Sequence, residues 1–188
     1  MKRIFLLMAG ILAAGVMAFA QSVEGAWFNS QDLSESGELA GQAIAKAEIS
    51  LNLNGGRFTE AVHTETKLTE AALKAMLGGN AGGAVFEITA DASFGGTYVQ
   101  EGDIITMTPD KKKPQVSIKT NIKGIPMGEA MADAMKPSVQ KSIENEMDDS
   151  IRYQVLSVTA TELKLMTLPT DKQKKRGEKE ETMVFTRK

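Results

Sequence analysis

The sequence contains no cysteine, one histidine and one tryptophan among its 188 residues. Without cysteine, disulfide staples, thiolate metal sites and cysteine nucleophiles are excluded. The lone His63 has no second histidine for a His-x-x-x-His metal motif, and no Gly-x-Ser-x-Gly elbow is present. We therefore expect His63 to be structural or merely exposed, and we predict that the protein is not an enzyme and has no metal site or cofactor. Carboxylate pairs stay open, because a sequence does not show which acidic residues meet in space.

The chain also lacks an excess of basic charge. Lys and Arg total 22 against 24 Asp and Glu, and removing residues 1–20 takes away two basic residues, which leaves 20 minus 24, or −4. A net acidic protein is a poor match for a phosphate backbone, so we expect no nucleic-acid partner.

The one long apolar run lies at the N-terminus. Lys2-Arg3 precede an apolar stretch that ends in Ala18-Phe19-Ala20, a small-x-small cleavage pattern. These features predict a signal peptide at 1–20, with an uncleaved membrane anchor as the alternative. We expect a secreted or periplasmic mature protein that does not span the membrane, and the missing cysteine closes the lipoprotein route. Residues 21–188 contain no repeat or low-complexity linker, so a single domain is predicted.

Alternation of apolar and polar residues predicts a mainly β protein. The longest alternating segment is 84–100. One parity holds Phe86, Ile88, Phe94 and Tyr98, and the other holds Glu87, Thr89 and Thr97. One continuous strand with the first set pointing inward explains this better than a turn at Asp91–Ser93, because a turn would break the phase. The nine predicted strands are 23–29, 46–53, 57–65, 84–100, 103–108, 115–122, 150–158, 162–168 and 180–187. A turn at Asp91–Ser93 would make ten.

Turn residues connect these strands. Asn54-Gly55-Gly56 and Glu101-Gly102-Asp103 predict tight hairpins. Lys111-Lys112-Lys113 is interpreted as a solvated hairpin tip rather than an anion-binding patch. Sequential strands then pair as an antiparallel meander that hides its edges by closing into a barrel. With nine strands the helix at 69–77 and the insertion at 124–149 would lie at opposite ends of the barrel, and with ten they would share one end.

Two helical segments interrupt the strands. Thr69 can cap a short helix near 69–77. A helical insertion near 127–149 is divided by Pro137 and carries an apolar stripe at every fourth position: Met127, Met131, Met135, Val139, Ile143 and Met147. Thioethers suit Cu(I), but Val139 and Ile143 cannot bind metal. We interpret the stripe as a flexible apolar face that caps one barrel end.

Three short motifs together resemble lipocalin-like (calycin-type) barrels. They are the Gly25-x-Trp27 opening strand, the Gly96-Thr97-Tyr98 strand that turns at Gly102-Asp103, and the closing segment 184–188. Small exported bacterial lipocalin-like proteins have this order over most of the mature chain. The resemblance implies an up-and-down barrel that often holds a small apolar ligand. The insertion at 124–149 and the lack of a cysteine pair depart from the usual pattern.

If the barrel holds a ligand, its inward aromatic side chains are the candidate binding residues. These are Trp27, Phe58, Phe86, Phe94, Tyr98 and Tyr153. Trp27 fits a core role better than a ligand-stacking role, because large aromatic side chains usually fill cores.

Three functions remain open after this inventory. A small-molecule carrier ranks first, a protein-interaction or inhibitor module that uses the barrel rim or the 127–149 insertion ranks second, and an enzyme ranks third. A carrier needs an enclosed apolar site, a module needs an exposed apolar patch, and an enzyme needs converging titratable groups.

Overall fold

A computed structural model describes residues 22–188, with gaps at 36–40, 80, 112–113, 126–129, 131–132, 135, 138–139, 142–143, 145–149, 176 and 178. The predicted signal peptide and the whole apolar stripe of the 127–149 insertion lie outside the described residues. Described positions between 130 and 144 are helical, and most of them are exposed. None of the helices in the described part combines the length and apolar character that a bilayer crossing requires.

Besides the helical positions between 130 and 144, the described part of the chain contains nine strands and two short helices. The strands are β1 (Gly25–Asp32), β2 (Ala43–Asn54), β3 (Arg57–Leu68), β4 (Val85–Glu101), β5 (Ile104–Pro109), β6 (Gln115–Lys123), β7 (Ile151–Val158), β8 (Glu162–Thr167) and β9 (Thr182–Arg187). The helices are α2 (Glu70–Met76), which Thr69 caps as predicted by accepting from Ala72 N, and α4 (Asp171–Lys175). Sequence analysis predicted no helix between the last two strands, 162–168 and 180–187, and so missed α4.

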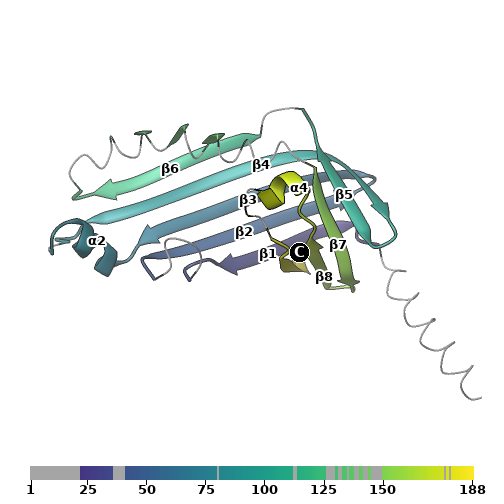
Figure 1. Cartoon of the computed structure of the whole chain (residues 1–188), viewed down its shortest axis with the longest axis horizontal. Helices are drawn as coiled ribbons and strands as arrows, with labels where there is room; N and C mark the ends of the chain where they lie inside the picture. Colours follow the sequence, from purple (N-terminus) through teal and green to yellow (C-terminus); the bar gives the residue numbers. More distant parts are fainter. Residues whose placement is uncertain are drawn as a thin grey trace, which may run out of the picture.

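The long strand β4 is continuous, which confirms the nine-strand prediction. Phe86 and Tyr98 are buried on its inner face, and Thr97 is exposed on its outer face. Eight of the nine strands form a closed antiparallel ring in the order β1-β2-β3-β4-β5-β7-β8-β9, with β9 returning to β1. The structure is therefore mainly β, with an up-and-down closed barrel (Figure 1).

The ninth strand, β6, lies outside the ring and corrects two predictions. One edge of β4 pairs with β3 from Glu87 to Thr97, so β5 and β6 share the other edge, with Tyr98↔Met107 in the first ladder and Ala90↔Ile118 in the second. Both are antiparallel to β4, so the chain keeps its direction between them. The connection from β5 to β6 is therefore not a hairpin, contrary to the prediction for the lysine segment, of which 112–113 lie outside the described residues.

The same arrangement places the end of β6 beside α2. Ile125, just after β6, packs against the cluster that contains Leu73 of α2. The prediction that the helix at 69–77 and the insertion at 124–149 would lie at opposite ends of the barrel was wrong, because the start of the insertion lies beside α2. It assumed a reversal at every connection, and the connection from β5 to β6 makes none.

Strand length divides the barrel into two halves. β2 and β3 have 12 residues and β4 has 17, whereas β5, β8 and β9 have 6 each. The short strands can close only part of the length of the long ones. We call that part the closed half. The rest of the long strands continues with β6 as an open sheet, which we call the open half (Figure 1).

Side chains fill the interior of the closed half. Trp27, Phe58, Met107, Leu165 and Phe185 are at most 1% exposed and belong to one core cluster. The indole N–H of Trp27 donates to the carbonyl of Val23 at 2.8 Å, so even this polar atom is satisfied. A second, smaller cluster of Leu73, Ala81 and Phe86 lies by α2.

Candidate functional site

A carboxyl group points into the barrel from β3. Glu60 has the same parity as Phe58, which is 1% exposed. Its partners in the ladders are Leu51 on β2 and Phe94 on β4, and both belong to or pack against the core cluster. Because side chains alternate along a strand, Glu60 faces the interior with these apolar neighbours.

Glu60 is half-buried and makes no hydrogen bond or ion pair with any described residue. Burial raises the pKa of its carboxyl group from 4.5 to about 7, because the charged form loses water without gaining a partner. Near neutral pH the group is therefore divided between its acid and its carboxylate forms. A carboxyl group held this way stabilises nothing, and perturbed pKa values of this kind concentrate at functional sites.

Tyr153, on β7 at another part of the barrel wall, interacts electrostatically with Glu60. It is 6% exposed, and burial raises the pKa of its hydroxyl well above the usual value. The negative charge of Glu60 raises the pKa of Tyr153 further, so the two groups share one interior region. Tyr153 consequently stays neutral over the physiological pH range.

Asn29 supplies a second unpaired polar atom at the seam between β1 and β9. The ladder between these strands has only two pairs, Trp27↔Arg187 and Phe28↔Thr186. Beyond them, the side-chain N–H of Asn29 donates to the carbonyl of Val184 at 2.7 Å and bridges the strands. Its Oδ1 atom is buried and has no hydrogen-bond partner among the described residues, and Asn29 is only 8% exposed. An unpaired buried acceptor typically costs about 1–3 kcal/mol.

Three apolar side chains next to these groups are only partly buried. Ile49, Phe94 and Ile151 face inward and pack against the core cluster without being enclosed. Phe94 lies between the stretch of β4 that pairs with β5 and the stretch that pairs with β6, where the closed half passes into the open half. We define the inner site by its members: Asn29, Ile49, Glu60, Phe94, Ile151 and Tyr153.

The predicted ligand-binding residues fall in three places. Trp27, Phe58 and Tyr98 are core residues of the closed half, and the Tyr98 hydroxyl donates to Glu24 at 3.2 Å. Phe94 and Tyr153 belong to the inner site, Phe94 as a partly buried residue and Tyr153 as a buried member of the core cluster. Phe94 also meets Phe58 edge to face, with ring centroids 5.7 Å apart. The remaining one, Phe86, lies in the cluster by α2 and is not brought to the others.

Sequence analysis missed Glu60 and Asn29. Each has the parity of a large core aromatic residue on its own strand, Phe58 for Glu60 and Trp27 for Asn29. A charged or amide residue at an inward position of an alternating strand was therefore a visible signal. It was not recognised because the strand was analysed for apolar residues alone.

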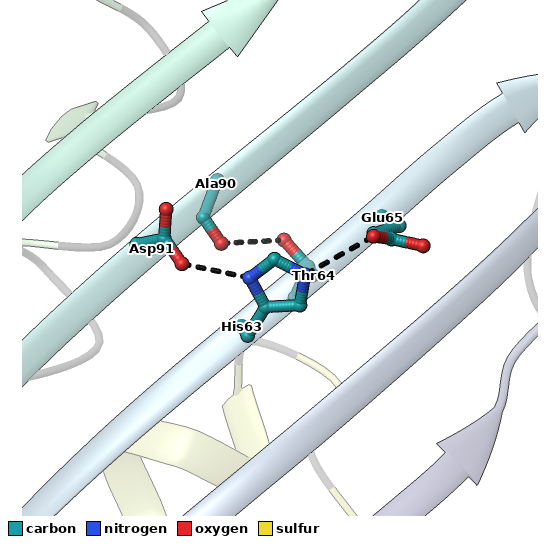
Figure 2. Close-up of polar contacts among 5 residues, drawn as sticks. All are labelled: His63, Thr64, Glu65, Ala90 and Asp91. Atoms are coloured by element: carbon teal, nitrogen blue, oxygen red, sulfur yellow. Dashed lines mark hydrogen bonds and ion pairs between the residues drawn. The ribbon is translucent and has the colours of Figure 1, made fainter.

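A different polar cluster lies on the outer face of β3. Figure 2 shows the ring of His63 between two carboxylates, with Nδ1 at 2.7 Å from Asp91 on β4 and Nε2 at 3.3 Å from Glu65. The hydrogen bond with Asp91, then that with Glu65, raises the pKa of His63 above 6.5. In the described part of the chain, no group of three ligating side chains is placed to hold a metal ion.

The hollows on this outer face are shallow and adjoin each other. One has a volume of about 420 Å³ and the other about 350 Å³. Both are lined by Ser50, Ala61, Ser93, Gln115 and Lys188. They form where small outward side chains of β2, β3 and β4 leave the sheet uncovered, and the larger hollow also touches the strands at Glu60 and Phe94.

Comparison of the chain with protein-family models gives no match, and comparison with curated proteins gives no significant match. The fold therefore defines the class of protein. It is a closed eight-stranded antiparallel barrel, consistent with a lipocalin-like fold.

Proposed function

We propose that this protein is an exported, bacterial lipocalin-like binding protein that holds a small apolar molecule at the inner site. The observation that carries the proposal is Glu60, an inward carboxyl group without a partner beside half-buried apolar side chains. Folding gains nothing from an isolated buried carboxyl group, whereas an otherwise apolar ligand with one polar end can satisfy it. The closed barrel and the resemblance to calycin-type proteins support the same function.

The inner site is a better location for the ligand than the centre of the closed half. Trp27 and Phe58 are enclosed by core neighbours and leave no room beside them. Ile49, Phe94 and Ile151 keep exposed surface at the junction of the two halves, and an apolar molecule would cover it. The ligand would therefore contact Phe94 and Tyr153 among the predicted aromatic residues.

Titration of the mature protein with N-phenyl-naphthylamine, a neutral apolar fluorescent probe, tests this function. We expect a saturable rise in fluorescence that Phe94→Leu weakens, because the substitution changes the shape of the proposed site. Val99→Ala is the matched control, since Val99 lies on the same strand with 58% of its surface exposed. Absence of saturable binding, or equal losses in both variants, would contradict the proposal.

A protein-interaction module is the second candidate, and the filled closed half favours it. The hollows of about 420 and 350 Å³ lie on the outer face, where a partner could reach them. Within the described part of the chain, the exposed large apolar residues are scattered rather than gathered in one patch, for example Ile44 on β2 and Leu156 on β7. If the neutral probe does not bind, this candidate takes first place.

A further inference from the structure

Resting on the proposed function, we infer that the inner site binds an amphipathic amine, meaning an apolar molecule whose polar end is a positively charged nitrogen with N–H groups. The inference starts from what the two unpaired groups have in common. The carboxylate of Glu60 and Oδ1 of Asn29 are both acceptors, and neither has a donor among the described residues. These two acceptors of the inner site are therefore left without a donor.

The donor of Asn29 is already committed. Its N–H group bonds to the carbonyl of Val184 at 2.7 Å, which fixes the amide so that Oδ1 is the atom left over. An ammonium group has three N–H donors and no acceptor, so it matches two unpaired acceptors. A fatty acid offers the opposite chemistry, because its carboxylate would repel an ionised Glu60 and leave Oδ1 unpaired.

The geometry allows one ligand end to reach both acceptors. Glu60 lies on β3 and Asn29 on β1, with β2 between them, so the two strands are roughly 10 Å apart. Glu60 pairs with Leu51 and Asn29 pairs with Ile49, which places them in adjacent inward rows. Both side chains extend toward the same interior, and this shortens the gap between the two acceptors.

The apolar and aromatic surroundings fit the rest of such a ligand. Phe94 is the direct neighbour of Glu60 in the β3–β4 ladder, and its ring can contact a cation held by the carboxylate. Ile49 and Ile151 offer partly exposed apolar surface for an alkyl or ring body. Tyr153 adds a neutral hydroxyl rather than a competing charge, because its pKa is raised.

The test compares dodecylamine, dodecanol and dodecanoate as displacers of N-phenyl-naphthylamine from the mature protein at about pH 8. These molecules share a chain length and differ in the charge of the polar end. At this pH Glu60 is mostly ionised and a primary amine is still protonated. We expect dodecylamine to displace the probe at a concentration at least about tenfold lower than dodecanoate, with dodecanol between them.

Glu60→Gln should reduce the affinity for dodecylamine about tenfold or more, and by a larger factor than the affinity for dodecanol. Glu65→Gln is the control, since it removes a carboxylate from the outer face of the same strand. If the two variants lose amine affinity equally, the preference comes from overall surface charge and the inference is overturned.

A measurement on the unaltered protein keeps the test independent of variant folding. Lowering the pH from about 8 to about 5 protonates Glu60, so dodecylamine should lose affinity by a larger factor than dodecanol. Leu51, Phe94 and Asn29 do not titrate, and the facing Tyr153 stays neutral, so Glu60 is the described group that changes charge there. Equal displacement by amine and acid would overturn the inference and leave the binding function intact. Failure of the neutral probe itself to bind would overturn both.

Discussion

The two faces of β3 place a titratable side chain in opposite environments. Glu60 points inward without a partner, and His63, three residues later, points outward between Asp91 and Glu65. The pKa of each group lies above its ordinary value. For Glu60 the cause is burial, which disfavours the charged form. For His63 the cause is hydrogen bonding to carboxylates, which favours the charged form.

The comparison shows that a raised pKa does not by itself tell whether a charge helps the fold. In both cases the folded state binds its proton more tightly than the unfolded state, so stability falls as the pH rises. Deprotonation of Glu60 creates a buried charge that destabilises the folded state. Deprotonation of His63 removes a charge that stabilises the folded state. Only the inner group has an unmet requirement that a ligand could satisfy.

Two adjacent glycines on β4 extend this comparison to packing. Substitution of the inward one is expected to change the stability of the protein more than any other variant considered. Gly96 faces inward, and a Cβ there would lie 2.1 Å from the Thr108 carbonyl oxygen and 2.7 Å from the Phe58 ring. Since both neighbours are fixed by the ladder and the core, Gly96→Ala should lower the free energy of unfolding by about 3 kcal/mol or more. Urea denaturation measures this loss.

Gly95→Ala is the matched variant on the outer face. Its Cβ would lie 2.9 Å from the Phe58 carbonyl oxygen, and its next contact is the methyl group of Thr59 at 3.5 Å. A smaller loss, of about 1–2 kcal/mol, is expected because a slight shift of the strand relieves it. Equal losses in the two variants would mean that the inner face is no more tightly packed than the outer one.

Glu60→Gln should give the next largest effect, and its sign depends on pH. The pKa of Glu60 is 4.5 unfolded and about 7 folded, so the stability tied to its proton is complete below 4.5 and lost as the pH rises to 7. The full shift corresponds to at most about 3 kcal/mol. At about pH 8 the variant should therefore be more stable than the natural protein by about 1–3 kcal/mol, because the amide remains polar but carries no charge.

The readout is the difference in unfolding free energy between the variant and the natural protein over a pH series. Asp32 and Glu70 have lowered pKa values, so their contribution to the stability of the protein decreases as the pH falls. In the pH dependence of the natural protein this trend opposes that of Glu60. The difference removes their contribution. A difference that is constant between pH 4.5 and 7 would show that Glu60 titrates normally and is not buried in solution.

Much of the fold was readable from the sequence because the strands alternate clearly. The continuous β4 followed from the unbroken parity of Phe86 and Tyr98, and the cap of α2 followed from Thr69. The place of β6 was not readable, because alternation gives the inner and outer faces of a strand but not the edge with which it pairs. The short helix α4 was missed because its buried residue, Gln173, is polar.

The candidate site was only half predictable. Phe94 and Tyr153 were chosen as aromatic residues, but aromatic character does not tell a filled core from a binding surface, and Trp27 and Phe58 proved to be core. That distinction depends on where the short strands end, since Ile49 and Ile151 keep exposed surface only at the junction of the two halves. Register and strand length together determine this, and neither follows from composition.

The smallest expected effect comes from the outer member of the comparison. His63 is 36% exposed and its carboxylate partners more so, so solvent screens the pair and His63→Gln should cost less than about 1 kcal/mol. This contribution is present below pH 6.5 and lost as the pH rises through the higher pKa of His63 in the folded state.

An NMR titration of the imidazole ring of His63 should give a pKa above 6.5. Asp91→Asn should lower this pKa more than Glu65→Gln, because the hydrogen bond to Asp91 is shorter, at 2.7 Å against 3.3 Å. A ring that titrates at or below 6.5 in the natural protein would show that the carboxylates do not hold it. In that case the outer face would have no stabilising charge, and the contrast with the destabilising charge of Glu60 would not hold.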